Sequence, residues 1–328
     1  MQSRRRFLGT SLFAASLAAT TSLRSTPGWS ALLAPASNID RDIDAVTGAG
    51  KSVTLSRLAV EDLARSLRGN LIIAGHPAYD ASRRVWNAQM DRHPALIIQP
   101  RGAADVRNAV QFARAADLLT AVKCGGHSPS GKSTCEKGML IDLSLLRGVR
   151  VDPQARTASV LGGSLLGDLD SEAMAHGLVT TAGTVSHTGV GGLTLGGGFG
   201  RVARRFGLSL DNVRAVEIVT ASGQILRADA QENAELYWGV RGGGGNFGVV
   251  TGFDFDLHPM QRQVYGGTLL FPITQARQVM KFWSEFESEA PDELYLSCGV
   301  MSNAGFSGQS GVGFIVCYSG PPGTEAPL

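Results

Sequence analysis

The stretch LLTAVKCGGHSPSGKSTCEKGMLIDLS, residues Leu118–Ser144, contains a phosphate-loop pattern: from Gly126, G-H-S-P-S-G-K-S satisfies G-x-x-x-x-G-K-[ST]. A true phosphate loop continues directly into a helix, whose amino terminus helps to hold the phosphates. Here only Thr134–Lys137 separate Ser133 from the next apolar run, which begins at Gly138. No helix of useful length fits into this interval. The stretch therefore predicts a strand–loop–strand unit and argues against a nucleoside triphosphatase.

The loop of this unit begins with Gly125 and Gly126, whose missing Cβ atoms let backbone N–H groups approach a ligand closely. It is one of three glycine clusters, which read GGHSPSG, GVGGLTLGGGFG and RGGGGNFG. Strand and helix patterns flank all three clusters, which argues against flexible linkers. Converging backbone N–H groups can bind an anion without a helix, so the clusters together suit a pyrophosphate. No strand leads directly into GGGFGR, which disfavours a dinucleotide-fold G-x-G-x-x-G.

The composition fits a soluble globular protein, because 43% of the 328 residues are apolar and 18% are charged. The length predicts two domains. The formal net charge is only +2, so no basic surface argues for nucleic acid as a partner. The four cysteines form no C-x-x-C motif, and no metal site is predicted.

Hydrophobic periodicity predicts strands and helices around the glycine clusters. We expect strands over 95–100, 118–124, 138–144 and 249–257, hairpins over 149–160 and 215–228, and helices over 103–116, 164–176 and 232–240. Beyond Pro259 the pattern predicts strands over 265–271, 294–301 and 311–318, and an amphipathic helix over 273–287. Residues 37–69 carry no readable pattern.

The N-terminal residues are interpreted as a targeting segment and are excluded from the fold. Ser3–Leu8 reads SRRRFL, which is typical of a twin-arginine signal, and a short apolar stretch follows. Arg24 interrupts this stretch before the roughly 20 apolar residues needed to span a bilayer, so no stable membrane anchor is expected. Ala34-Pro35-Ala36 provides a small-residue cleavage site. We predict a signal peptide at 1–36, the twin-arginine export machinery as a partner, and a periplasmic or secreted location.

Five segments in the order of the chain identify a family. They are VWNAQMDRHPALIIQP, VKCGGHSPSG, GMLIDLS, AGTVSHTGVGGLTLGGGFGRVARRFGLSLDNV and ELYWGVRGGGGNFGVVTGFDFDLHP. Residues 85–259 thereby resemble the FAD-binding domain of the vanillyl-alcohol oxidase/p-cresol methylhydroxylase (PCMH-type) superfamily, most closely its bacterial berberine-bridge-enzyme-like branch. The resemblance implies an α+β fold with an FAD domain of two subdomains, followed by a substrate domain with an antiparallel sheet and helices.

This resemblance also sets the expected domain boundaries. They are an N-terminal segment at 37–89, the PCMH-type FAD-binding domain at 90–260, and a substrate-binding domain at 261–328. Family members continue well beyond this length, so we expect the substrate domain to be incomplete and the chain to be C-terminally truncated. The catalytic base is expected beyond Leu328, and no catalytic residue is assigned within the chain.

His127 is the central candidate residue. From the residues alone, a histidine in a turn either bonds to nearby backbone or has a chemical role. The resemblance implies that His127 is joined covalently to the 8α carbon of FAD. In some relatives a cysteine in the loop before the second cluster forms another flavin bond. Val185 occupies that position here, which implies a single histidyl link.

The resemblance implies that further residues surround the FAD, although ordinary turn glycines and a core valine are the alternative for some of them. His187 is interpreted either as a residue on the substrate side or as a structural one. The expected cofactor-binding residues beside His127 are Gly125, Gly126, Ser128, Gly131, Gly183, Thr184, Gly189, Gly192, Gly197 and Val250.

The resemblance implies an FAD-dependent oxidase. A small-molecule substrate, either a sugar-like alcohol or an amine, would give a hydride to the flavin, and dioxygen would reoxidise the flavin to produce hydrogen peroxide. Two alternatives stay open. One is a flavin dehydrogenase with an acceptor other than oxygen, and the other is a catalytically incomplete FAD-binding fragment.

Overall fold

The computed structural model describes residues 37–301, 310–321 and 323–324. The expected signal peptide and its cleavage site Ala34-Pro35-Ala36 lie outside these described residues. Within the described ranges, no helix combines the length and the apolar character that crossing a membrane requires.

The first sheet is mostly parallel, and its central strands are completely buried. Strands β4 (Leu96–Gln99), β6 (Met139–Asp142) and β5 (Thr120–Lys123) run parallel, and β3 (Asn70–Ile72) pairs antiparallel with β4. Every residue of β4 and β6 is buried, as expected for parallel strands that are covered on both faces. This confirms the apolar runs ALIIQP and GMLIDLS as strands.

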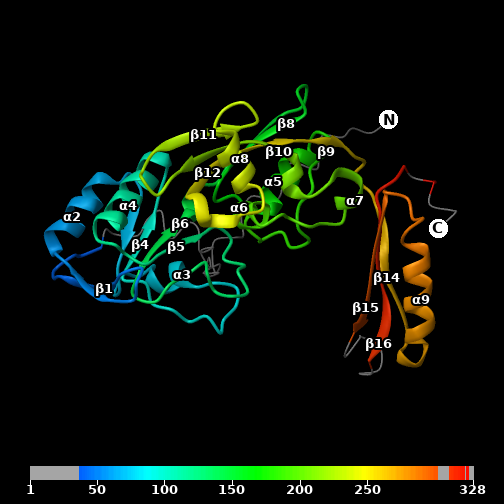
Figure 1. Ribbon diagram of the computed structural model, residues 1–328, viewed down its shortest axis with the longest axis horizontal. Helices are drawn as coiled ribbons and strands as arrows, with labels where there is room; N and C mark the ends of the chain where they lie inside the picture. Colours follow the sequence, from blue (N-terminus) through cyan, green and yellow to red (C-terminus); the bar gives the residue numbers. More distant parts are fainter. Residues whose placement is uncertain (1–36, 302–309, 322, 325–328) are drawn as a thin grey trace, which may run out of the picture. The chain divides into compact units, whose positions relative to one another are not determined.

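Helix α4 (Ala103–Ala115) and helix α2 (Arg57–Ser66) cover this sheet (Figure 1). The buried apolar positions of α4 are Val106, Ala109 and Ala113, whose spacing places them on one face of the predicted helix. Residues 37–69, which had no readable pattern, form the hairpin β1 (Ile43–Val46) and β2 (Ser52–Leu55) and then α2.

The second sheet is antiparallel and has the strand order β11-β10-β12-β8-β7. Both predicted hairpins are confirmed, since β7 pairs with β8 and β10 pairs with β11. The strand bounds are β7 Val149–Asp152, β8 Thr157–Leu161, β10 Val213–Val219, β11 Ile225–Asp229 and β12 Val249–Asp256. A short pair, β9 (Leu178–Val179) with β13 (His258–Pro259), lies outside this sheet.

Helices pack against one face of the second sheet. Leu166 and Leu169 of α5, Val190 of α6 and Val240 of α8 share a core with Phe253 and other strand residues. The helix bounds are α5 Leu166–Met174, α6 Val190–Leu195 and α8 Ala234–Val240, and two further short helices are α3 Tyr79–Arg83 and α7 Ala203–Phe206. Helix α6 was not predicted, because it lies inside the glycine cluster GVGGLTLGGGFG, and glycine disfavours helices.

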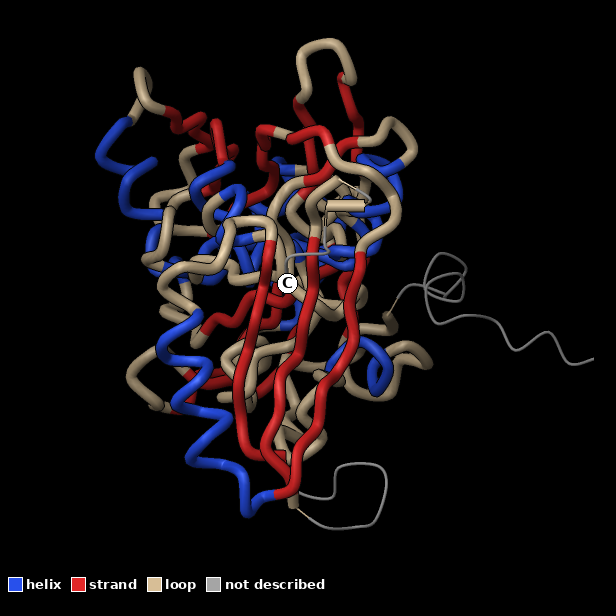
Figure 2. The backbone as a smooth tube through the Cα atoms, turned by 90° about the vertical axis from the view of Figure 1, so that its right-hand side faces the viewer, coloured by secondary structure: helices blue, strands red, loops and turns tan. Residues whose placement is uncertain are grey.

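The third sheet is a three-stranded antiparallel unit made by the C-terminal part of the chain. Figure 2 shows its long strands side by side: β14 (Tyr265–Pro272), β16 (Gly311–Tyr318) and β15 (Leu294–Met301). Helix α9 (Ala276–Phe286) lies on one face, where Val279 packs with Val312 and Phe314. All four elements match their predicted positions. The predicted α+β fold class, with an antiparallel sheet and a helix in the C-terminal part of the described chain, is confirmed.

Candidate functional site

The loop that carries His127 starts at the carboxyl end of β5 and leads into β6. Because β5 and β6 are parallel neighbours, this loop is the crossover between them, and it contains turns and bends but no helix between Lys123 and Met139. The structure thus has the predicted strand–loop–strand arrangement. The phosphate-loop pattern of Gly126–Ser133 lacks the helix that such a site needs.

The first glycine cluster contacts the second through backbone alone. A Cβ atom on Gly125 would overlap the backbone nitrogen of Gly189, and a Cβ on Gly189 would overlap the backbone nitrogen of Gly125 and the sulfur of Cys124. Both glycines are therefore required by this close approach. The third cluster joins them, since Gly242 N donates a hydrogen bond of 3.1 Å to Leu195 O. Three segments far apart in the sequence thus meet in one place.

His127 lies between two rings. Its Nε2 atom is 2.6 Å from Nδ1 of His187, and the two ring centroids are 4.5 Å apart. Trp86 stacks on the imidazole of His127 at 5.4 Å, with an angle of 16° between the planes. The backbone N of Trp86 also donates to Gly126 O at 3.0 Å. These contacts fix both the loop and the orientation of the His127 ring.

His187 lies in a turn that is anchored to the start of α5. Thr188 N donates to Val185 O and closes the turn, while Leu166 N and Gly167 N donate to Thr188 O and Ser186 O at 2.9 and 2.8 Å. The carbonyls of this turn therefore satisfy two of the N–H groups that the first turn of any helix leaves free. The main chain holds His187 in place, and its side chain is left to contact His127.

The charge state of His127 follows from its surroundings. Burial lowers the pKa of this imidazole below its ordinary value, and the neighbouring His187 lowers the pKa further. The ring is consequently neutral at neutral pH. A neutral imidazole has one nitrogen with a free lone pair, which is the form that can act as a nucleophile.

A buried polar cluster supports the strand ends beneath this loop. Lys123 Nζ, at the end of β5, is 3.2 Å from Asp142 Oδ2 at the end of β6. Gln99 Nε2, at the end of β4, donates to the same carboxylate at 3.1 Å. All three side chains are almost inaccessible to solvent. Their contacts connect the carboxyl ends of the three parallel strands immediately before the His127 loop begins.

The other predicted cofactor-binding residues differ in their surroundings. Ser128 accepts a hydrogen bond from Lys132 N at 3.2 Å and so stabilises its own turn. Gly131 and Gly197 have φ values of +70° and +119°, which favour glycine for conformational reasons alone. Gly183 packs tightly against Leu193 and Leu166, and Thr184 is exposed.

Gly192 and Val250 are the last two of the predicted cofactor-binding residues. Gly192 faces open space, because a Cβ there would meet no described atom within 4 Å. The Val250 side chain is buried in the core of the second sheet, where its residue pairs with Ile218. The assignment of these residues to a cofactor remains a prediction.

Sequence reasoning did not find the two ring contacts of His127. Trp86 lies in the segment VWNAQM, which helped to identify the family, but it was given no role. His187 was assigned only to the substrate side or to a structural role, although it is separated from His127 by 60 residues and bonds to it directly. The only signal in the sequence was a second histidine close to a glycine cluster.

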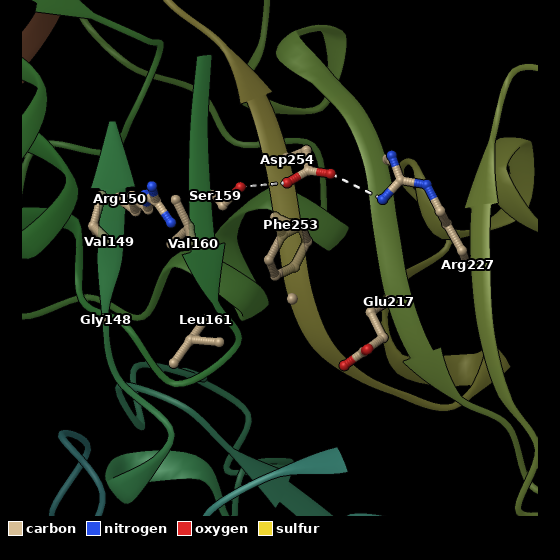
Figure 3. Close-up of a pocket in the computed structure, with 12 residues that line it drawn as sticks. Gly148, Val149, Arg150, Ser159, Val160, Leu161, Glu217, Arg227, Phe253 and Asp254 are labelled. Atoms are coloured by element: carbon tan, nitrogen blue, oxygen red, sulfur yellow. Dashed lines mark hydrogen bonds and ion pairs between the residues drawn. The ribbon is translucent and has the colours of Figure 1, made fainter. Parts of the chain in front are cut away.

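A separate cavity of about 430 Å³ lies on the second sheet, on the face opposite α5 and α6 (Figure 3). Two of its charged residues pair with each other, since Asp254 accepts from Arg227 at 3.0 Å, and the same carboxylate accepts from Ser159 at 2.8 Å. These residues come from strands that carry none of the glycine clusters. The cavity is therefore distinct from the region around His127.

The third sheet and its helix contact the second glycine cluster and the α7 segment that follows it. The rings of Phe199, in the second cluster, and Tyr295 of β15 are 6.0 Å apart. Arg204 of α7 forms an ion pair of 2.7 Å with Glu287, which follows α9, and also donates to Ala290 O at 2.8 Å. Residues of β15 thus lie next to the second glycine cluster.

The chain matches a known protein family and several curated proteins. Residues 94–229 match the model of the FAD binding domain family. A curated relative, (R)-6-hydroxynicotine oxidase of Paenarthrobacter nicotinovorans, is 32% identical over 71% of this chain and 51% of its own length. The chain spans about half the length of the first curated relatives that it matches.

Solved structures agree with this family match. A berberine-bridge-enzyme-like protein of Physcomitrella patens has a TM-score of 0.75 at 27% identity, covering 82% of this chain and 58% of that one. A chitooligosaccharide oxidase has a TM-score of 0.74 at 27% identity, covering 82% and 56%.

Three features of the described residues fit a flavin at this position. First, Nδ1 of His127 has no hydrogen-bond partner recorded among them. Second, Gly192 opens onto free space, so packing within the described residues does not require glycine there. Third, Trp86 beside His127 and Val185 beside His187 are 64% and 41% exposed, which leaves apolar surface available to a flat ring system.

Proposed function

We propose that the protein is an FAD-dependent oxidase whose flavin is bonded covalently to His127 alone, because residues 94–229 match the FAD binding domain family and the similar proteins include a 6-hydroxynicotine oxidase and a berberine-bridge-enzyme-like protein. The observation that carries the proposal is the geometry of the His127 ring, which contacts Trp86 and His187 while no partner of its Nδ1 is recorded in the described chain. The lowered pKa of this imidazole supports the proposal, because it favours the neutral form. Val185, at the position of the second attachment site of some relatives, supports a single link, because valine cannot bond to a flavin.

The substrate class is a small molecule with an alcohol or an amine group. The chitooligosaccharide oxidase among the similar structures and the 6-hydroxynicotine oxidase among the relatives support these two chemistries. When bound, FAD would accept a hydride from the substrate and pass the electrons to dioxygen, producing hydrogen peroxide. The chain itself contributes binding: the backbone N–H groups of the glycine clusters suit the pyrophosphate, and His127 prevents the cofactor from dissociating.

A histidine substitution tests the attachment. We expect the purified protein to be yellow, with flavin that stays on the polypeptide in a denaturing gel. His127→Ala should lose this covalent flavin, whereas His176→Ala, an exposed histidine just after α5, should keep it. Covalent flavin in the alanine variant at position 127 would contradict the proposal.

Peptide mapping tests the single link. Flavin should be found on the peptide that contains His127 and on no cysteine-containing peptide. Val185→Cys has the side chain needed for a thioether, so it provides a positive control for a second bond if the loop geometry allows one. A flavin-linked cysteine in the wild-type protein would disprove the single link.

The electron acceptor is tested separately. The reduced flavin, formed with a panel of sugars, alcohols and amines, should be reoxidised rapidly in air and produce peroxide in stoichiometric amount. Slow reoxidation in air with fast reoxidation by an artificial acceptor would identify a dehydrogenase. Flavin that is bound but never reduced by any substrate would indicate a catalytically incomplete fragment.

Export by the twin-arginine route is proposed from Ser3–Leu8 alone, because these residues lie outside the described part of the structure. Replacing Arg4 and Arg5 by lysine should keep the precursor in the cytoplasm, while the amount of total protein stays the same. An unchanged periplasmic or secreted yield would argue for another route.

A further inference from the structure

The contact between His127 and His187 determines which nitrogen of His127 is available for reaction. Only one proton can lie between His127 Nε2 and His187 Nδ1, which are 2.6 Å apart. If His127 donates, its Nε2 carries the hydrogen and its Nδ1 keeps a lone pair. If His187 donates, Nδ1 of His127 carries the hydrogen and is no nucleophile. Formation of a bond at Nδ1 therefore requires that His187 accepts.

Other contacts hold this arrangement in place. Trp86 covers a face of the His127 ring, and the turn that carries His187 is bonded to the start of α5 through main-chain atoms. Nε2 of His127 is blocked by His187, whereas no partner of Nδ1 is recorded in the described ranges. The two nitrogens of His127 are thus in different environments, and only Nδ1 is open to a cofactor.

We propose that His187 is a positioning residue for flavin attachment, which accepts the Nε2 proton of His127 so that the covalent bond forms at Nδ1. This inference rests on the proposed function, since it concerns the same flavin bond. His187 itself acts through His127 and is assigned no contact with substrate or cofactor.

His127 Nδ1 would form a C–N bond to the 8α carbon of FAD, and the methyl group there would lose one proton. The Nε2–H bond of His127 would break, and its proton would move to His187. The electron pair left by the methyl C–H bond would reduce the isoalloxazine ring. Dioxygen would take up this electron pair and two protons as hydrogen peroxide, so that the flavin bonded to His127 ends in its oxidised form.

A merely structural role of the His187 side chain is not expected from its surroundings. The side chain is exposed, so its removal leaves no cavity in the core, and the hydrogen bonds of its turn involve main-chain atoms. His187→Ala should therefore fold and bind FAD. This makes the rate of covalent attachment measurable separately from folding.

The experiment uses apoprotein from a riboflavin-auxotrophic host, incubated with FAD in air. Covalent flavin is followed by fluorescence of the denatured polypeptide, and the linked nitrogen is identified by NMR of the flavinyl peptide. In the wild type we expect attachment at Nδ1. In His187→Ala we expect attachment roughly a hundredfold slower, as is typical for loss of a positioned proton acceptor. Added imidazole should restore much of the rate, and His176→Ala serves as the control with the wild-type rate.

His187→Asn separates orientation from proton uptake. The asparagine amide oxygen can accept a hydrogen bond near the position of Nδ1 but takes up no proton at neutral pH. We expect this variant to keep attachment at Nδ1 and to remain slow. A wild-type rate in either variant, no effect of imidazole on the alanine variant, or a wild-type bond at Nε2 would each overturn the inference. Absence of flavin from the wild-type His127 peptide would instead overturn the proposed function.

Discussion

Strands β4 and β14 show how differently two regions of this chain use apolar sequence. All four residues of β4, LIIQ, are buried, whereas none of the eight residues of β14, YGGTLLFP, is classed as buried. Strand β4 is covered by helices and by neighbouring strands on both sides, and β14 is an edge strand of the three-stranded sheet. Apolar content alone therefore says little about how much a strand contributes to stability; burial decides it.

The same contrast applies to the regions as a whole. Residues 43–259 contain the two larger cores, and the candidate flavin site is built on them. In residues 265–318, Leu269, Phe282 and Val300 are each more than half exposed. Exposed apolar side chains next to edge strands favour association, so we expect the protein to aggregate at high concentration. Matched substitutions in the two regions test this comparison.

The largest effect is expected for a buried ion pair. Lys123→Met removes the partner of Asp142, whose side chain is 1% exposed, and an unpaired buried charge costs about 3–5 kcal/mol. In α9, Lys281 and Glu285 are 72% and 67% exposed, and Lys281→Met should change the free energy of unfolding by less than about 0.5 kcal/mol. Urea denaturation of both variants measures the difference. Equal losses of unfolding free energy in the two variants would contradict the expected difference between a buried and an exposed ion pair.

Two leucines give the next largest contrast. Leu96 of β4 is completely buried, and Leu96→Ala should lower the free energy of unfolding by about 2–5 kcal/mol through lost burial and a residual cavity. Leu269 of β14 is 54% exposed, so Leu269→Ala should cost about 1 kcal/mol or less. Thermal unfolding followed by circular dichroism compares them. A large loss for Leu269→Ala would mean that this strand is covered in solution, for example by another copy of the chain.

Two glycines give the smallest individual effects, and these effects have opposite signs. Gly125→Ala places a methyl group against the backbone of Gly189 and should cost about 1–3 kcal/mol, together with part of the covalent flavin. Gly267→Ala, in β14, points into open space and should stabilise the protein by about 0.5–1 kcal/mol, because alanine loses less conformational freedom. Denaturation midpoints and the flavin content of denatured protein measure both. A neutral Gly125→Ala would refute the close approach of the two loops.

Local features were predicted well, because they depend on residues close together in the sequence. The inward face of α4 follows from the spacing of Val106, Ala109 and Ala113, and the turn at Gly223 follows from its hairpin. Helix α6 was missed, since local propensity disfavours a helix among glycines. It forms because Val190 is fully buried and its N–H group bonds to Ser164 O, which are tertiary contacts.

In the candidate site, too, some features follow from the sequence and others depend on tertiary contacts. The sequence by itself determined that the His127 loop joins two strands without a helix, because only Thr134–Lys137 separate Ser133 from the next strand. It also indicated His127 as the central residue, through resemblance to a family. Only the tertiary structure decided that Gly125 meets Gly189 and that Trp86 and His187 hold the His127 ring. The physical reason is that periodicity encodes which face of an element is buried, whereas the partner of an exposed loop residue depends on how distant elements pack.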